Sequence, residues 1–258
     1  MRNAFEKIKE IYRLTNKPND FLFNQWVCRP PAAVMVYVLK NRRITPNQVT
    51  FLSLLMALFA NAALLFLRNH PGLVLSAIFL QFAFILDCTD GQLARIRGTS
   101  STLGGLLDFL MDEIKAVTLV AAISGRLAWQ SAERNDTRLA LCWLGLGLLG
   151  VVMVAIGIAL TTFMRRPEYL QISQPKESSP SPLKKTFLRK LISACEWVGK
   201  SVINYPSWFW LPAFAGQIEW FLLPYLTAHF LYLGRSSLSV LLLLGKSSPK
   251  GTSLVFVK

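Results

Sequence analysis

The chain alternates between long apolar runs and short polar, mostly basic segments. About 20 apolar residues are enough for an α-helix to cross the hydrocarbon core of a bilayer. Clear runs of this kind occupy residues 47–68, 72–95, 101–127, 138–164 and 207–233. A final run, Leu238 to Leu244, is short and is either the end of a sixth span or a membrane-associated tail. The pattern predicts an all-α, polytopic membrane bundle of about six transmembrane helices.

The N-terminal region predicts an interfacial segment rather than a span. Residues 1–20 are polar and basic and lack the apolar core of a signal peptide. The apolar stretch within residues 21–41 is too short to cross a bilayer. We expect an amphipathic helix there, with Phe21, Phe23, Trp26 and Val27 facing the lipid, and a short first span is the alternative.

The predicted boundary between these two regions lies at residue 46. Thr45 can cap the first long helix, and Pro46 suits its first turn. We therefore divide the chain into a cytoplasmic or interfacial segment, 1–46, and a transmembrane domain, 47–258.

Composition and charge support a membrane protein. Of the 258 residues, 53% are hydrophobic and only 16% are charged, whereas about 25% are charged in an average soluble domain. The net charge is +14, and its Lys and Arg residues lie between the apolar runs. This distribution favours contact with anionic membrane lipids, and no nucleic-acid motif is present. The four cysteines form no CxxC pair, which excludes a common zinc signature.

The segment 165–206 is a basic linker, with eight Lys or Arg residues against three Glu. Its part from Leu183 to Ile203 has helical apolar spacing and predicts an amphipathic helix on the lipid surface. The positive-inside rule places both this linker and the N-terminal region in the cytoplasm. Four spans between them satisfy that placement, and the loop at 95–101 then also faces the cytoplasm.

Four aspartates interrupt this apolar pattern beside the loop at 95–101. A carboxylate near the centre of a membrane helix costs about 2.5–3.5 kcal/mol, so such residues usually mark function. Asp87 and Asp90 are three residues apart and Asp108 and Asp112 are four apart, so each pair shares one helix face. Because a short loop joins the two helices, we expect all four carboxylates to converge. Hard divalent cations, which prefer oxygen ligands, would relieve their repulsion and could clamp a diphosphate.

Small and basic residues surround the same loop. The small residues are Gly91, Ala94 and Gly98 before it, and Gly104 and Gly105 after it. They allow a nucleotide or a neighbouring helix to approach the backbone, although simple helix packing is an alternative. Arg95 is placed to reach a phosphate, but both Arg95 and Arg97 are also explained as positive loop charges. Two aspartates alone would also suit a proton relay in a transporter.

The aspartates and small residues together resemble the signature of the CDP-alcohol phosphatidyltransferase family. The matching residues are Asp87, Asp90, Gly91, Ala94, Arg95, Gly104, Asp108 and Asp112, and every fixed position of the signature is present. The arrangement of spans and the N-terminal interfacial helix are also similar to the family. The segment Ile44 to Thr50 is similar to the entry of branches that transfer inositol phosphates, whereas the run Gly98 to Ser101 is similar to choline and ethanolamine phosphotransferases.

The resemblance implies a role for each signature residue. Asp87, Asp90 and Asp108 would bind two ions of Mg²⁺ or Mn²⁺, with Asp112 contributing to the second. The CDP moiety would contact Gly91, Ala94 and Arg95, with Gly104 in the same binding region. Asp112 would also be the catalytic base that takes the proton of the acceptor hydroxyl, and CMP would then leave.

The resemblance therefore implies a phospholipid-synthesising enzyme of the cell inner membrane, with its active site facing the cytoplasm, and suggests a homodimer. Its partners would be a CDP-linked donor, an alcohol acceptor and membrane lipids. CDP-diacylglycerol is the expected donor, while transfer from CDP-choline or CDP-ethanolamine to diacylglycerol is an alternative. An ion or proton transporter is the alternative from another class. Lys115, three residues after Asp112, would either pair with an aspartate or touch the substrate.

Overall fold

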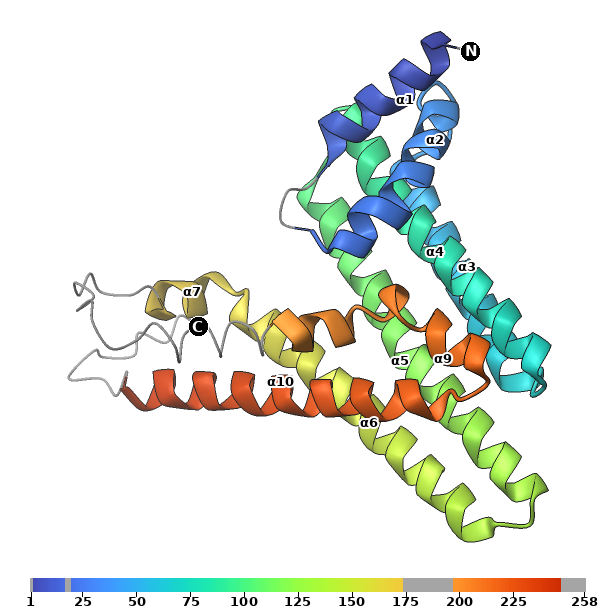
Figure 1. The fold of residues 1–258 in the computed structure, drawn as a ribbon. Coiled ribbons are helices and arrows are strands. Elements are labelled where there is room, and N and C mark those ends of the chain that lie inside the picture. Colours follow the sequence, from blue (N-terminus) through green and yellow to red (C-terminus); the bar gives the residue numbers. More distant parts are fainter. Residues whose placement is uncertain (1, 17–19, 174–196, 247–258) are drawn as a thin grey trace, which may run out of the picture.

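The computed structural model describes residues 2–16, 20–173 and 197–246, and within these ranges it contains helices and no strand. Figure 1 shows a long helical bundle with the N-terminal helices at one end. The four described helices that are long and apolar enough to cross a membrane are α3, Pro46–Phe66; α4, His70–Ile96; α6, Thr137–Met164; and α10, Glu219–Lys246. The predicted all-α, polytopic membrane fold is confirmed, and the number of about six spans stays a prediction.

The first four predicted spans correspond in position to α3, α4, α5 (Thr102–Glu133) and α6, but α5 is not among the four helices whose length and composition suffice to cross a membrane. The largest difference in their limits is at α5, which continues to Glu133 instead of ending near Leu127. The start of α3 is capped as predicted, since the Thr45 hydroxyl accepts from the backbone of Gln48, whose side chain accepts from the backbone of Thr45. Pro46 occupies the first turn, where its missing N–H is harmless.

Small and branched apolar side chains hold the long helices together. α3 packs against α4 and α5, α5 packs against α6, and α10 packs against α6. The core contains Ala57, Ala60 and Leu64 from α3, Leu80 from α4, and Leu119 and Ile123 from α5. Close packing also explains Gly147 in α6, where an added Cβ would lie 2.4 Å from the Cβ of Ser124. Such contacts let the helix backbones approach closely, as in other membrane bundles.

A buried arginine closes the end of the bundle that lies away from the aspartates. Arg126 of α5 is 1% exposed. Its guanidinium donates to the carbonyl groups of Leu64, Leu67, Arg68 and Asn69 at 2.7–2.9 Å. These carbonyls belong to the C-terminus of α3 and the turn into α4, where helix carbonyls lack intrahelical partners. One side chain therefore satisfies the backbone of the α3–α4 turn.

The C-terminal part differs from the prediction of a span at 207–233 followed by a separate short run. A 3₁₀ turn, η2 (Tyr205–Ser207), leads into the short helix α9 (Trp210–Ala215), which ends at Gly216 with a φ of 75°. The helix α10 then begins at Glu219, inside the predicted span, and runs without a break through the predicted short run to Lys246. It crosses α6 at a steep angle, and its C-terminal half extends beyond it (Figure 1). A separate sixth span is therefore absent from the residues described up to 246.

Most of the predicted amphipathic helix at 183–203 lies outside the described residues. Of that segment, residues 197–203 are described and are helical. At the other end of the basic linker, α7 (Pro167–Ser173) is a short helix directly after α6.

The N-terminal region contains an amphipathic helix where only polar sequence was expected. α1 (Arg2–Thr15) buries Ile11 in a small core with α2 (Arg29–Leu39), α3 and α4, while Phe5 and Leu14 are exposed. Residues 21–41 do not form the single helix predicted, because a π-helical turn, η1 (Asn24–Cys28), precedes α2. Trp26 and Val27 are exposed on this turn, as the lipid-facing prediction requires.

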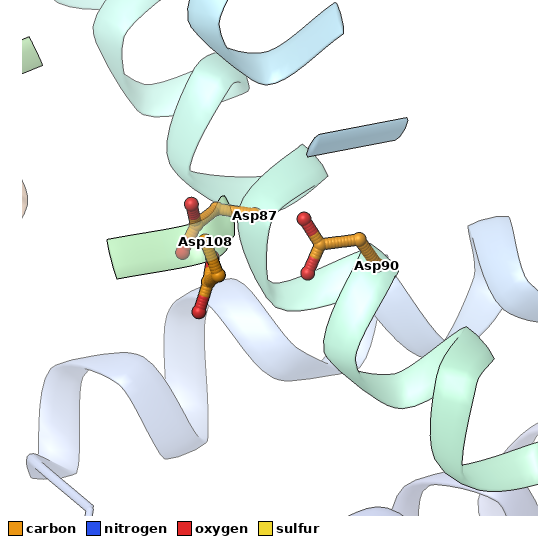
Figure 2. Close-up of side chains that lie close together, drawn as sticks. All are labelled: Asp87, Asp90 and Asp108. Carbon is orange, nitrogen blue, oxygen red and sulfur yellow. The ribbon is translucent and has the colours of Figure 1, made fainter. Parts of the chain in front are cut away.

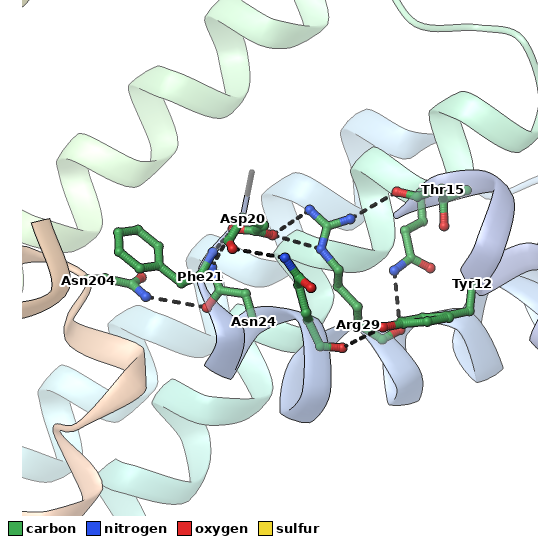
Figure 3. A network of polar contacts seen from close by, with 9 residues as sticks. Tyr12, Thr15, Asp20, Phe21, Asn24, Arg29 and Asn204 are labelled. Atoms are coloured by element: carbon green, nitrogen blue, oxygen red, sulfur yellow. Dashed lines mark hydrogen bonds and ion pairs between the residues drawn. The ribbon is translucent and has the colours of Figure 1, made fainter. Parts of the chain in front are cut away.

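A buried ion pair fixes this region to the rest of the molecule (Figure 3). Arg29 pairs with Asp20 at 2.6 Å and donates to the carbonyl of Thr15 at the end of α1. Asp20 also accepts from Asn24, which in turn accepts from Asn204, just before η2. The network therefore connects α1, η1 and α2 with a segment about two thirds of the chain further on.

We expect Arg126→Met to destabilise the bundle strongly. The change removes four hydrogen bonds from a charged donor and leaves buried carbonyls unsatisfied, which should cost about 3 kcal/mol or more. Thermal unfolding in detergent should show a fall of several degrees in Tm. Arg138→Met, which removes an exposed arginine at the same end of the bundle, is the control. An equal Tm for the two variants would contradict the role given to Arg126.

Candidate metal centre

A tight turn brings the two aspartate-bearing helices together. At the end of α4, the N–H of Gly98 donates to the carbonyl of Arg95 and that of Thr99 donates to the carbonyl of Ala94. This pairing, with Gly98 at a φ of 64°, is a Schellman motif. Ser101 then caps α5 by accepting from the backbone of Gly104 at 3.0 Å. Gly98 is therefore needed for the turn itself, because its positive φ is one that other residues rarely adopt.

Three of the four aspartates converge beside this turn. Asp87 and Asp90 of α4 and Asp108 of α5 each place a carboxylate oxygen within 4.8 Å of the others (Figure 2). Asp90 is 5% exposed, and its Oδ2 atom is buried and accepts no hydrogen bond from the described protein. A buried carboxylate oxygen with no donor is costly unless a cation satisfies it.

The residues present fit a hard divalent cation. Mg²⁺ prefers oxygen ligands and is commonly held by one or two carboxylates together with substrate phosphates. Asp87, Asp90 and Asp108 would therefore hold the ion, and we call them the three-carboxylate cluster.

The fourth aspartate is arranged differently, because it pairs with a lysine. The ammonium of Lys115 lies 2.6 Å from Oδ1 of Asp87 and 2.9 Å from Oδ1 of Asp112. Lys115 is 2% exposed, whereas the side chain of Asp112 is 50% exposed. Of the two sequence-based alternatives for Lys115, pairing with an aspartate is confirmed. Asp112 lies outside the three-carboxylate cluster, and its contribution to a metal site stays a prediction.

The residues expected to contact the CDP moiety line the same end of the bundle. Gly91 follows Asp90 on α4, and the guanidinium of Arg95 lies over it, with Nη1 3.5 Å from the position of an added Cβ. Ala94 is partly buried, while Arg95 is exposed. Gly104 lies at the start of α5, where an added Cβ would lie 3.2 Å from Oγ of Ser101 and 3.7 Å from Oδ1 of Asn47. Their roles toward CDP remain predictions.

The start of α3 contributes residues to the site that the sequence-based interpretation did not assign. Thr50 is 4% exposed, its hydroxyl donates to the carbonyl of Pro46 at 3.2 Å, and its side chain is a close neighbour of Asp90. Asn47 lies one turn earlier, next to Gly104. Both belong to the segment Ile44 to Thr50, which the sequence analysis identified as similar to the family. That similarity did not indicate that the segment contacts the aspartates.

Arg97 is a structural clamp and not a free loop charge. Its guanidinium donates to the carbonyls of Leu39, Lys40, Arg42 and Ile44 at 2.5–3.2 Å. These groups form the end of α2 and the connection to α3. The clamp therefore fixes the start of α3, including Asn47 and Thr50, against the end of α4.

Tyr205 of η2 covers the site from the C-terminal part of the chain. It packs on the main core and interacts electrostatically with Lys115, Asp112 and Asp87. Burial raises the pKa of its hydroxyl above the ordinary value, so the phenol is neutral at physiological pH. Tyr205 therefore adds no charge beside Lys115.

Comparisons with known proteins agree with the sequence-based resemblance. The family model described as CDP-alcohol phosphatidyltransferase matches residues 43–222. The archaetidylinositol phosphate synthase of Pyrococcus horikoshii is 35% identical over 88 residues, which are 33% of this chain and 45% of that protein. The bifunctional IPC transferase and DIPP synthase of Thermococcus kodakarensis is 36% identical over 70 residues, 27% of this chain and 15% of that protein. The chain thus spans less than half the length of either relative.

A solved structure is also similar. It is the crystal structure of Mycobacterium tuberculosis phosphatidylinositol phosphate synthase with CDP-DAG bound, at 20% identity and a TM-score of 0.47. The match covers 86% of this chain and 97% of that chain.

Asp90→Asn separates metal binding from a structural role. Without metal, and at a pH high enough for all three carboxylates to be charged, the change removes one of three mutually repelling charges, so the Tm should rise relative to the unchanged protein. Added Mn²⁺ should raise the Tm of the unchanged protein, because a ligand that binds only the folded state stabilises it, and should have little effect on the variant.

Asp136→Asn is the control for this measurement, since Asn also caps the start of α6 well. A lower metal-free Tm for Asp90→Asn, with an unchanged response to Mn²⁺, would show that Asp90 only supports the fold.

Proposed function

This chain belongs to the CDP-alcohol phosphatidyltransferase family, and we propose that it transfers a substituted phosphate group from CDP-diacylglycerol to an alcohol, with release of CMP. The observation that supports this reaction is the convergence of Asp87, Asp90 and Asp108 beside the glycine-flanked turn between α4 and α5. Carboxylates in that arrangement suit a cation-bound diphosphate better than a proton path, which has no need of Gly91 or Arg95. The protein is an integral membrane transferase of phospholipid biosynthesis.

Different side chains in the site have different roles in the proposed reaction. The three-carboxylate cluster would hold a divalent ion, Mg²⁺ or Mn²⁺, which would supply positive charge to offset that of the diphosphate and of the leaving CMP. Arg95, exposed one turn after Gly91, contributes a guanidinium for a phosphate oxygen. The role of these groups is to bind the CDP moiety and orient its outer phosphorus toward the acceptor.

Asp112 is the group best placed to act as the base. It lies one turn after Asp108 on α5, and its side chain is half exposed, so an acceptor hydroxyl can approach it. In the proposed step the hydroxyl oxygen attacks the phosphorus distal to the cytidine, and its proton passes to the Asp112 carboxylate. The P–O bond of the anhydride breaks and CMP leaves with the electron pair. Lys115 donates to Asp112 at 2.9 Å and holds its carboxylate in position.

The acceptor and the exact donor follow from the relatives only as proposals. The name of the Pyrococcus horikoshii relative states that it makes archaetidylinositol phosphate. We therefore take a phosphorylated inositol as the first acceptor to test. Transfer from CDP-choline or CDP-ethanolamine to diacylglycerol is the second reaction class to test.

We propose that the enzyme resides in the cell inner membrane as a homodimer, with the aspartates at the cytoplasmic surface. Support for the orientation comes from the basic N-terminal region and the basic linker, which the positive-inside rule places in the cytoplasm. The turn at 97–101 then also faces the cytoplasm, where CMP is soluble and where the nucleotide head group of a membrane-bound CDP-diacylglycerol would lie.

Membranes that contain the protein should release CMP from CDP-diacylglycerol when Mg²⁺ or Mn²⁺ and an alcohol acceptor are both present. The measurement is a screen of CDP-diacylglycerol, CDP-choline and CDP-ethanolamine against inositol phosphate, other polyols and diacylglycerol. Release from CDP-choline with diacylglycerol alone would contradict the proposed donor. Ion flux in proteoliposomes without any CMP release would contradict the enzyme itself.

Asp112→Asn should lower the rate of CMP release about 10²- to 10⁴-fold, the range expected for loss of a general base. Mn²⁺ binding at the three-carboxylate cluster should persist, because Asp112 lies outside it. Glu133→Gln is a matched control, since Glu133 is on the same helix, is 52% exposed and also pairs with a basic side chain. Full activity of Asp112→Asn would eliminate Asp112 as the base.

A further inference from the structure

Asp87 takes part in two different charge arrangements. On one side it belongs to the three-carboxylate cluster with Asp90 and Asp108. On the other side its Oδ1 atom accepts from Lys115, which also donates to Oδ1 of Asp112. The ammonium therefore lies between Asp87 and Asp112, the fourth aspartate of the signature, which the family resemblance assigns to a second divalent ion.

The position of Lys115 is enclosed and leaves its ammonium little freedom. The residue is 2% exposed on α5 and faces Asp87 on α4, and Tyr205 of η2 lies close enough to interact with it. A buried ammonium needs carboxylate or other acceptor partners, because leaving it unpaired in a low-dielectric site is very costly. Lys115 has two such partners in contact, both at distances typical of charge-assisted hydrogen bonds.

A second divalent ion is poorly compatible with this arrangement. An ion bound at Asp112 would lie beside a positive charge that is 2.9 Å from one oxygen of Asp112 and 2.6 Å from one oxygen of Asp87. Movement of the lysine out of the site would uncover a buried charge without a partner. The three-carboxylate cluster has no such conflict, since Asp90 keeps a buried oxygen without a donor.

We propose that Lys115 is a built-in second cation, so that the site binds one divalent ion at Asp87, Asp90 and Asp108 while the ammonium of Lys115 occupies the place between Asp87 and Asp112. Lys115 is then a positioning residue, which holds the base Asp112 beside the reacting phosphate. This inference rests on the proposed function for its purpose, but its metal count does not depend on any activity. It also departs from the two ions that the family resemblance implies.

The test is the number of Mn²⁺ ions bound per chain by the full-length protein in a neutral detergent. Electron paramagnetic resonance counts bound Mn²⁺ and also detects spin coupling between two neighbouring ions. We expect one ion for the unchanged protein, with and without CDP, and no coupling. Asp90→Asn should abolish this binding, which assigns the counted ion to the cluster.

Lys115→Met removes the charge and nearly keeps the length of the side chain. It should raise the count to two ions with detectable coupling, whereas Lys115→Arg should keep the count at one. Lys9→Met, an exposed lysine of α1, is the control and should also bind one. If Lys115→Met does not fold, the count for the unchanged protein and for Lys115→Arg still decides the question.

Two coupled ions in the unchanged protein, with or without CDP, would overturn the inference. CMP release, measured on the same preparation, keeps this outcome separate from the proposed function. One bound ion without CMP release from any donor would sink the proposed reaction and leave the metal count intact. CMP release with two bound ions would contradict the inferred metal count and leave the proposed reaction intact.

Discussion

Repulsion among carboxylates is the constraint on which this site depends. Two unit charges 4 Å apart near a protein surface interact by about 4 kcal/mol, and three carboxylates lie within 4.8 Å here. Lys115 contacts Asp87 and Asp112, so it offsets only part of that charge. The negative charge that Lys115 does not offset lies nearest to Asp90, whose buried Oδ2 atom accepts no hydrogen bond. The fold thereby creates a place that could bind a divalent cation, which would relieve the remaining repulsion.

The carboxylates cannot relieve this repulsion by moving apart, because the helices that carry them are fixed at both ends. Arg97 ties the end of α4 to the α2–α3 connection, and Arg126 ties α5 to the α3–α4 turn. Each guanidinium satisfies several backbone carbonyls at a helix end, which only a planar group with several donors can do. Between the two clamps, small residues such as Ala57, Ala60 and Gly147 allow close helix packing. The rigid packing of the helices thus keeps the carboxylates close together despite their electrostatic repulsion.

The features that could be predicted from the sequence are those encoded locally. Apolar runs and the Thr45 cap place α3, α4, α5 and α6 closely, and helical spacing brings the aspartates to one end of the bundle. The clamps could not be predicted, since Arg97 binds carbonyls 53 to 58 residues earlier and nothing beside it indicates them. The continuity of α10 was missed because Arg235 interrupts its apolar run, while the break at Gly216 lies inside a run that reads as continuous. Helix α1 was missed although Ile8, Ile11 and Tyr12 recur at helical spacing, because the charged residues between them hid an apolar face whose partners lie far along the chain.

Asp87 links the two halves of the proposed chemistry through its two charge partners. Its negative charge is shared between Lys115 and whatever cation the three-carboxylate cluster holds. A cation bound there draws on the charge of Asp87, so Lys115 must rely more on its other partner, Asp112. Arrival of a cation-bound diphosphate would therefore tighten the hydrogen bond that orients the base, before any acceptor is present. Because Lys115 is buried and contacts both carboxylates, this coupling needs no movement of a helix or loop, only a redistribution of charge across a single ammonium group.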